Sequence, residues 1–181
     1  MTPAQRFAPG VCILLAGCMH LWSAPKSSPQ RVALPLAGGG QAEPIDVSAA
    51  LCITVAPTVY FSKLEVQRSA AVSRIAEREP FLPIRVVLTL DREVPPGSGR
   101  FALKWRTLDV TSSQTESWSA AEVGRILAYT TLPRGRYRVR AEVPVAIPAL
   151  GDVAGHLELW SSFKSIPPSS AECARAERGD A

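Results

Sequence analysis

The chain has 181 residues, of which 46% are hydrophobic, so one packed domain with tails is expected and a wholly disordered chain is excluded. Its 16 prolines and 12 glycines argue against long helices and favour many short elements. The formal net charge of +4 permits an anionic partner without requiring one, and no apolar run reaches the roughly 18 residues that a membrane-spanning helix needs.

Residues 1–17 have the pattern of an export signal. Arg6 is their single charged side chain, and a short apolar stretch from Val11 leads to the small residues Ala16 and Gly17. Leu15-Ala16-Gly17-Cys18 resembles the lipobox of bacterial lipoproteins. This resemblance implies that the thiol of Cys18 takes up a diacylglycerol group and becomes the first residue of a membrane-anchored mature protein. Met19, rather than Asp, favours the outer membrane if sorting resembles that of enteric bacteria.

Two other interpretations of this segment stay open. The first is an ordinary secretory signal cleaved after Ala24, which would release a soluble protein; Trp22 and Pro25 fit the small-residue pattern of such a site poorly. The second is a buried helix over residues 11–21.

The remaining chain divides into a linker, a domain and a tail. Residues 18–50 are expected to hold the lipidated cysteine and a flexible linker, because residues 24–44 are rich in Pro, Gly and Ser and lack apolar periodicity. A folded domain is predicted over residues 51–166, and a polar tail over 167–181.

Alternation of apolar and polar residues predicts strands through the domain. Residues 137–143 alternate most regularly, with apolar residues on odd positions and charged ones on even positions. Period-2 alternation means that each strand buries one face. The turn signals Pro95-Pro96-Gly97 and Pro133-Arg134-Gly135 separate such strands, so the pattern predicts an all-β, antiparallel β-sandwich. The strands are expected at residues 84–90, 101–106, 126–132, 137–143 and 157–163.

Two marks in this series are typical of one sandwich class. Trp105 lies in the middle of a predicted strand, and Gly135-Arg136-Tyr137 opens the most regular one. This order resembles an immunoglobulin-like domain, with a core Trp on strand C and a tyrosine corner at the start of strand F. The resemblance implies that these two strands are neighbours and that the Tyr137 hydroxyl bonds back to the backbone. Val139 stands where antibody domains have a Cys, so the chain is similar to sandwiches that lack the inter-sheet disulfide.

Residues 62–78 permit two interpretations. Ser62-Lys63-Leu64-Glu65 matches a capping box that would begin a helix ending at Pro80. The β-branched and aromatic residues Val59-Tyr60-Phe61 favour instead a first strand that runs into a loop.

Two of the four cysteines remain for pairing. Cys12 leaves with the signal and Cys18 is consumed by lipid, so Cys52 and Cys173 are an even pair in an oxidising compartment. A bridge between them is expected; the alternative is a buried Cys52 and a free thiol in the tail.

No catalytic or metal-binding constellation is found in the sequence. The two histidines, His20 and His156, have no ligand or acid–base partner at a suitable spacing, and His156 with Glu158 reads as a surface pair. No cofactor motif is present. Asp91, Asp109 and Asp152 fall near strand ends, where loops would have to bring them together to form an enzyme site.

The predicted binding surface is a basic sheet face. Three arginines alternate along one predicted strand, and a lysine and an arginine share the outer side of another. If these strands are neighbours, five cations line one face without acids, which suits an anionic envelope polymer or an acidic protein. A solvated face that uses arginine for solubility is the alternative. The five cations are Lys104, Arg106, Arg136, Arg138 and Arg140.

These observations favour a lipid-anchored, non-enzymatic interaction or structural module of the cell envelope. The alternatives are a soluble periplasmic or secreted binding protein with the same fold, and a small envelope enzyme with carboxylates borne on loops. The export signal and the mild charge argue against a nucleic-acid partner.

Overall fold

The computed structural model describes residues 30–62, 64–65, 82–112, 117–118, 121–151, 153–161 and 167–179. The expected signal peptide, Cys18 and most of the ambiguous segment 62–78 lie outside these residues.

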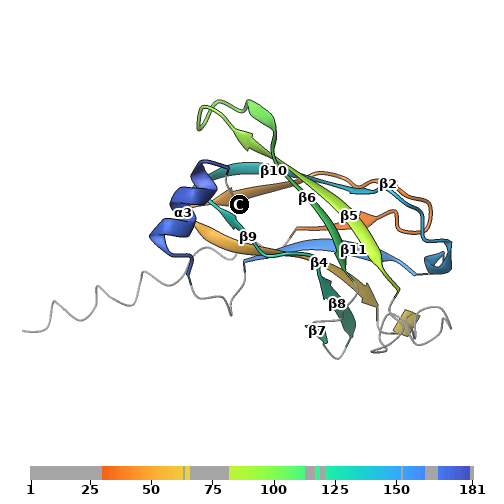
Figure 1. The fold of residues 1–181 in the computed structure, drawn as a ribbon. Coiled ribbons are helices and arrows are strands. Elements are labelled where there is room, and N and C mark those ends of the chain that lie inside the picture. Colours follow the sequence, from red (N-terminus) through yellow and green to blue (C-terminus); the bar gives the residue numbers. More distant parts are fainter. Residues whose placement is uncertain are drawn as a thin grey trace, which may run out of the picture.

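The described chain forms two antiparallel sheets that face each other (Figure 1). The first, sheet A, has the order β1-β11-β4-β8-β7, with β9 also paired to β4. The second, sheet B, has the order β2-β10-β5-β6, with β3 also paired to β10. The predicted all-β, antiparallel sandwich is therefore confirmed. Sheet A comprises β1 (Arg31–Leu34), β4 (Ile53–Ser62), β7 (Ser117–Trp118), β8 (Glu122–Ile126), β9 (Thr130–Leu132) and β11 (Gly155–Ser161). Sheet B comprises β2 (Gly40–Gln41), β3 (Ile45–Ala49), β5 (Ile84–Glu93), β6 (Phe101–Ser112) and β10 (Gly135–Val143).

The core lies between the inward faces of the two sheets. Tyr137, Val139, Ala141 and Val143 of β10 are all buried, as the alternation predicts. Residues at even positions of β5 supply Ile84, Val86, Leu88 and Leu90 from the neighbouring strand, and Val59, Phe61, Val123 and Leu157 come from sheet A.

The predicted linker and domain boundary are wrong in part, because β1, β2 and β3 all lie within residues 31–49. β1 pairs with β11, and β3 pairs with β10 from Ala49↔Gly135 to Ile45↔Val139. These short strands are stabilised by hydrogen bonds to β11 and β10, which lie far along the chain. Because Pro and Gly separate them, the local sequence has the pattern of a linker and does not indicate this pairing. The positive φ angles of Gly39 (73°) and Gly40 (112°) make the turn into β2, a conformation that glycine adopts without strain.

The predicted polar tail is a docked helix, α3 (Ser170–Glu177). Ser169 and Glu172 form a capping box: the Ser169 side chain accepts from the Glu172 backbone N–H, and Glu172 accepts from that of Ser169. Ala176 is fully buried. The disulfide between Cys52 and Cys173, the pairing expected from the sequence, joins this helix to the start of β4, with the two Cα atoms 6.1 Å apart.

Strand order differs from the expected arrangement. β5 lies between β6 and β10, so the strand that carries Trp105 does not adjoin the strand that carries Tyr137. β10 and β11 belong to different sheets, and β2 and β3 lie beside β10. A short 3-10 helix, η1 (Pro148–Leu150), makes the crossing between the two sheets.

Candidate functional site

The outward face of β10 carries Arg136, Arg138 and Arg140, as predicted, but each meets an acid. Arg138 pairs with Asp46 of β3, with Nε–Oδ1 and Nη2–Oδ2 distances of 2.8 Å and 3.1 Å. Arg140 binds Asp91 of β5 through two hydrogen bonds of 3.0 Å. The Nη1 atom of Arg136 lies 3.5 Å from Oε1 of Glu93, also on β5.

The prediction of a basic face without acids is therefore wrong. Its error follows from the strand order, because β5 and β3 flank β10 and bring their carboxylates to its arginines. The hydrogen bonds from Arg138 lower the pKa of Asp46, as expected for a carboxylate beside a guanidinium. We call these three arginines and their acids the ion-paired ladder.

Arg106 does not belong to the outer face at all. It is only 5% exposed, and it points from β6 into the sandwich, where its Nη1 atom donates to Thr130 Oγ1 (2.9 Å) and to the Thr131 carbonyl (3.3 Å). Its guanidinium lies 4.6 Å from the centre of the Trp105 ring. Burial lowers its pKa, and within the described chain its Nε and Nη2 atoms have no hydrogen-bond partner.

A bulge in the β5–β6 ladder explains this change of direction. The register shifts between Leu90 and Arg92, and Lys104 opposite adopts a left-handed φ of 56°. The buried carboxylate of Asp91 fills the bulge and accepts the Lys104 backbone N–H at 2.7 Å. The bulge breaks the period-2 alternation, so Arg106 faces inward while the Lys104 side chain is exposed.

A second guanidinium, on Arg125 of β8, also lies inside the sandwich. Arg125 is fully buried and donates from Nη1 to the backbone carbonyls of Leu82 and Ser112. Burial lowers its pKa to about 10. Sequence reasoning missed this residue because a lone Arg in a short strand carries no signal of its direction.

The end of the sandwich that carries α3 contains the predicted tyrosine corner. The hydroxyl of Tyr137 donates to the Pro133 carbonyl at 2.6 Å, as the resemblance implied, and burial raises its pKa to about 12. Trp105 packs on the Tyr137 ring at 5.3 Å between ring centres. Arg92 lies over both rings and binds Glu177 of α3 through two hydrogen bonds of 2.6 Å and 3.1 Å.

We found no sequence signal for this Arg92–Glu177 contact. The capping pattern Ser169-Ser170-Ala171-Glu172, however, would have revealed the helix that presents Glu177.

The outer face of sheet A holds a second polar cluster. Arg31 bridges two carboxylates, with its Nη2 atom 2.6 Å from Oε2 of the buried Glu158 and its Nη1 atom bound to Glu122. His156 pairs with Tyr60 across β11 and β4 and shares a strand face with Glu158. No hydrogen bond joins His156 to Glu158 among the described residues, and the acid is engaged by Arg31.

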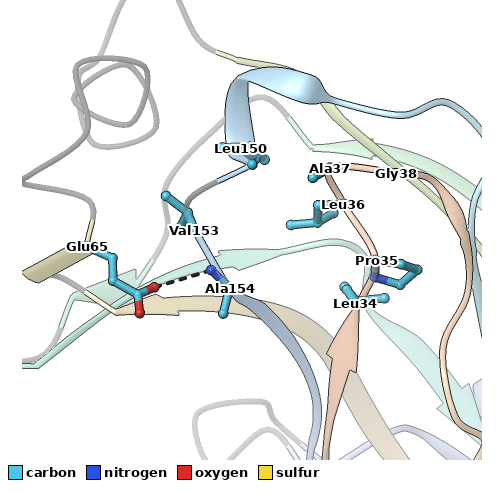
Figure 2. Close-up of a pocket in the computed structure, with 10 residues that line it drawn as sticks. Leu34, Pro35, Leu36, Ala37, Gly38, Glu65, Leu150, Val153 and Ala154 are labelled. Atoms are coloured by element: carbon cyan, nitrogen blue, oxygen red, sulfur yellow. Dashed lines mark hydrogen bonds between the residues drawn. The ribbon is translucent and has the colours of Figure 1, made fainter.

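One hollow of about 380 Å³ opens at the end of the sandwich opposite α3 (Figure 2). Apolar side chains, among them Leu36, Leu150 and Val153, form its walls, and the carboxylate of Glu65 there accepts the Ala154 backbone N–H at 3.2 Å. Within the described residues no group of three or more His, Cys, Asp and Glu side chains is placed to bind a metal. No helix in the same residues is long and apolar enough to cross a membrane.

Comparisons with known proteins add a likeness in fold. No family model matches the chain, and no curated protein matches it. A crystal structure of a protein from Sulfurospirillum deleyianum is similar, with a TM-score of 0.55 and 11% sequence identity over 75% of this chain and 98% of that one. At this identity the likeness concerns the fold alone.

Proposed function

We propose that this protein is a lipid-anchored, extracytoplasmic lipoprotein that serves as a non-enzymatic interaction or structural module of the cell envelope. The observation that carries the proposal is the bridge between Cys52 and Cys173 in a chain whose first residues have the pattern of an export signal. Disulfides persist in oxidising compartments outside the cytoplasm, and the bridge leaves Cys18 to the lipobox.

The length of the tether supports a position near a membrane. Twelve residues lie between Cys18 and Arg31, the first residue of β1. Fully extended, they span at most about 45 Å. Two or more acyl chains on Cys18 would make the attachment durable, since one chain alone binds only marginally. The sandwich would therefore work close to the bilayer surface.

The partner that we propose is an anionic envelope component or an acidic protein. The ion-paired ladder is poorly suited to it, because its arginines already hold carboxylates. Exposed cations without an ion pair within the described chain include Arg100, Lys104 and Arg134.

Metabolic labelling with a fatty-acid analogue tests the anchor. The wild-type chain and the Cys18→Ala variant are labelled, and both are followed through membrane fractionation. We expect label on the wild type alone and an uncleaved or released variant. An unlabelled wild type in the soluble fraction, starting near residue 25, would replace this proposal by that of a soluble secreted binding protein.

A further inference from the structure

One end of the sandwich gathers features that are distant in the sequence, and we call it the helix pole. The end of β5, the start of β10 and the end of β3 meet there, because Arg92 pairs with Tyr137 and Ala49 pairs with Gly135. α3 closes this end through its disulfide to Cys52. The turn between β5 and β6 projects from the same end (Figure 1). The opposite end contains the last residues of β4 and β10 together with η1, and we call it the far pole.

Apolar side chains are exposed at the helix pole. Leu51 is 73% exposed, Val94 53% and Leu103 74%. Val94 and Leu103 flank the projecting turn, in which residues 94–100 are all exposed and two prolines replace backbone donors. Binding at a membrane interface grows with buried apolar area and with electrostatic attraction to anionic lipids, and this turn offers both apolar and cationic side chains.

Charge distinguishes the two poles within the described chain. At the helix pole, Arg100, Lys104 and Arg134 are exposed and have no acidic partner. The acids of that pole are engaged: Glu93 accepts the Gly99 N–H at 2.6 Å, and Glu177 holds Arg92. Towards the far pole, Glu43 and Glu142 are exposed without a basic partner, and Arg85 is held by Asp109 at 2.6 Å. Among the described residues, the helix pole is therefore cationic and the far half acidic.

The direction of β1 relates these poles to the N-terminal tether. β1 runs antiparallel to β11, from Arg31↔Glu158 to Leu34↔Gly155, and Gly155 in turn pairs with Phe61 near the far pole. The strand thus runs away from the helix pole, and the chain enters β1 from the helix-pole side. A tether of at most about 45 Å from this side lets the helix pole reach the membrane that holds the anchor.

We propose that the helix pole is a membrane-contact surface, which rests the turn between β5 and β6 on anionic lipid headgroups. This rests on the proposed lipid anchor for its biological setting, and it adds an orientation of the domain. Val94 and Leu103 enter the headgroup layer, and Arg100, Lys104 and Arg134 face lipid phosphates. The acidic far half, with the hollow of Figure 2, faces away from the membrane.

Vesicle flotation of the Cys18→Ala chain, expressed from residue 18 so that the apolar export signal is absent, tests this contact without the acyl anchor. The vesicles contain phosphatidylcholine with or without phosphatidylglycerol. Binding to the anionic vesicles is expected, and salt should weaken it. Arg100→Gln should weaken it about fivefold, the effect of one Lys or Arg near an anionic surface. Leu103→Ser should weaken it by a similar factor.

Matched controls lie towards the far pole. Arg85→Gln removes the same charge as Arg100→Gln, and Val145→Ser removes an apolar side chain that is 60% exposed. Both controls should leave binding unchanged within about twofold. No binding by the parent chain, or equal losses at both poles, would overturn the contact surface. Because every chain here lacks Cys18, failure of this test leaves the lipid anchor to the labelling experiment, and the reverse also holds.

Discussion

The side chain of Tyr137 fixes the turn that leads into β10. Its hydroxyl reaches back four residues to the Pro133 carbonyl, and both residues are buried. A buried carbonyl that loses its donor has no water to replace it. The hydrogen bond therefore contributes to the stability of the turn in addition to the packing of the Tyr137 ring.

We predict that Tyr137→Phe lowers the free energy of unfolding by about 1–3 kcal/mol, the cost of a buried acceptor left without its donor. Urea denaturation measures the change. Tyr129→Phe is the matched control, because Tyr129 is 60% exposed, and it should change stability little. Equal effects of the two substitutions would contradict the assignment of the tyrosine corner.

Asp91 and Asp109 form the same kind of bidentate pair in different surroundings. The side chain of Asp91 is 3% exposed, and it bonds both Arg140 and the Lys104 N–H. The side chain of Asp109 is 49% exposed and bonds Arg85 alone. Burial decides the energetic weight of a pair, because a charge left alone away from water is costly.

Asp91→Asn should therefore lower the free energy of unfolding by about 2 kcal/mol, through the loss of charge-assisted hydrogen bonds to a buried acceptor, whereas Asp109→Asn should change it little because that pair is exposed. Chemical denaturation of both variants, in low salt and in 1 M salt, gives the comparison. If the two substitutions cost the same, Asp91 does not support the bulge in the way that its contacts indicate.

At the scale of elements, the sequence predicts a strand well where apolar and polar residues alternate along it. β5, β6, β10 and β11 fall where they were expected, and the predicted strand at 126–132 is divided into β8 and β9. β1 and β3 were missed because only their partners, β11 and β10, make them strands. Arg106 was placed on the wrong face because one left-handed residue, Lys104, reverses the alternation after it.

The sequence predicted which arginines share one face at the candidate site, but not which acids pair with them. The alternation placed Arg136, Arg138 and Arg140 on one face correctly. Their acids come from β3 and β5, and a sequence pattern within β10 holds no information about which strands lie beside it. The disulfide could be predicted because the expected signal peptide and lipobox would leave only two cysteines for pairing.

The disulfide ties the helix α3 to the start of β4. The bridge closes a loop of 121 residues. On the chain-entropy model a loop of this length stabilises the fold by about 5 kcal/mol. Combining Cys52→Ser with Cys173→Ser should remove this stabilisation, as measured by guanidinium denaturation.

Reducing agent provides the control for this prediction. It should bring the wild type to the stability of the double variant and leave the double variant unchanged. A loss below about 1 kcal/mol would mean that the unfolded chain is not constrained as the model assumes. Hydrogen exchange of the α3 amides would then show whether the helix stays docked through Arg92 and Ala176 alone.

For the whole molecule, acidic side chains act as fixed partners spread over several surfaces. Asp46 and Asp109 hold arginines on sheet B, and Glu172 caps α3. The pKa of each is lowered from its ordinary value: by the hydrogen bond from Arg138 for Asp46, by that from Arg85 for Asp109, and by that from the Ser169 side chain for Glu172. Protonation of these carboxylates at low pH therefore lowers the stability of the fold.

A carboxyl group with a lowered pKa in the folded state binds its proton more tightly in the unfolded chain. Its contribution is complete above its ordinary pKa, 3.8 for Asp46 and Asp109 and 4.5 for Glu172, and is lost as pH falls through the lowered value. We therefore expect a melting temperature that changes little between pH 7 and 5 and falls below about pH 4.

Combining Asp46→Asn with Asp109→Asn isolates the part that sheet B contributes to this acid dependence. The variant should lose less stability than the wild type between pH 5 and 3, because two of the groups that take up protons on unfolding are gone. High salt should reduce the difference, since both pairs are exposed and therefore screened. If the variant loses as much stability between pH 5 and 3 as the wild type, the pH dependence arises from Glu172 or from other groups at the helix pole. Amide exchange in α3 at pH 3 would then decide between these two sources.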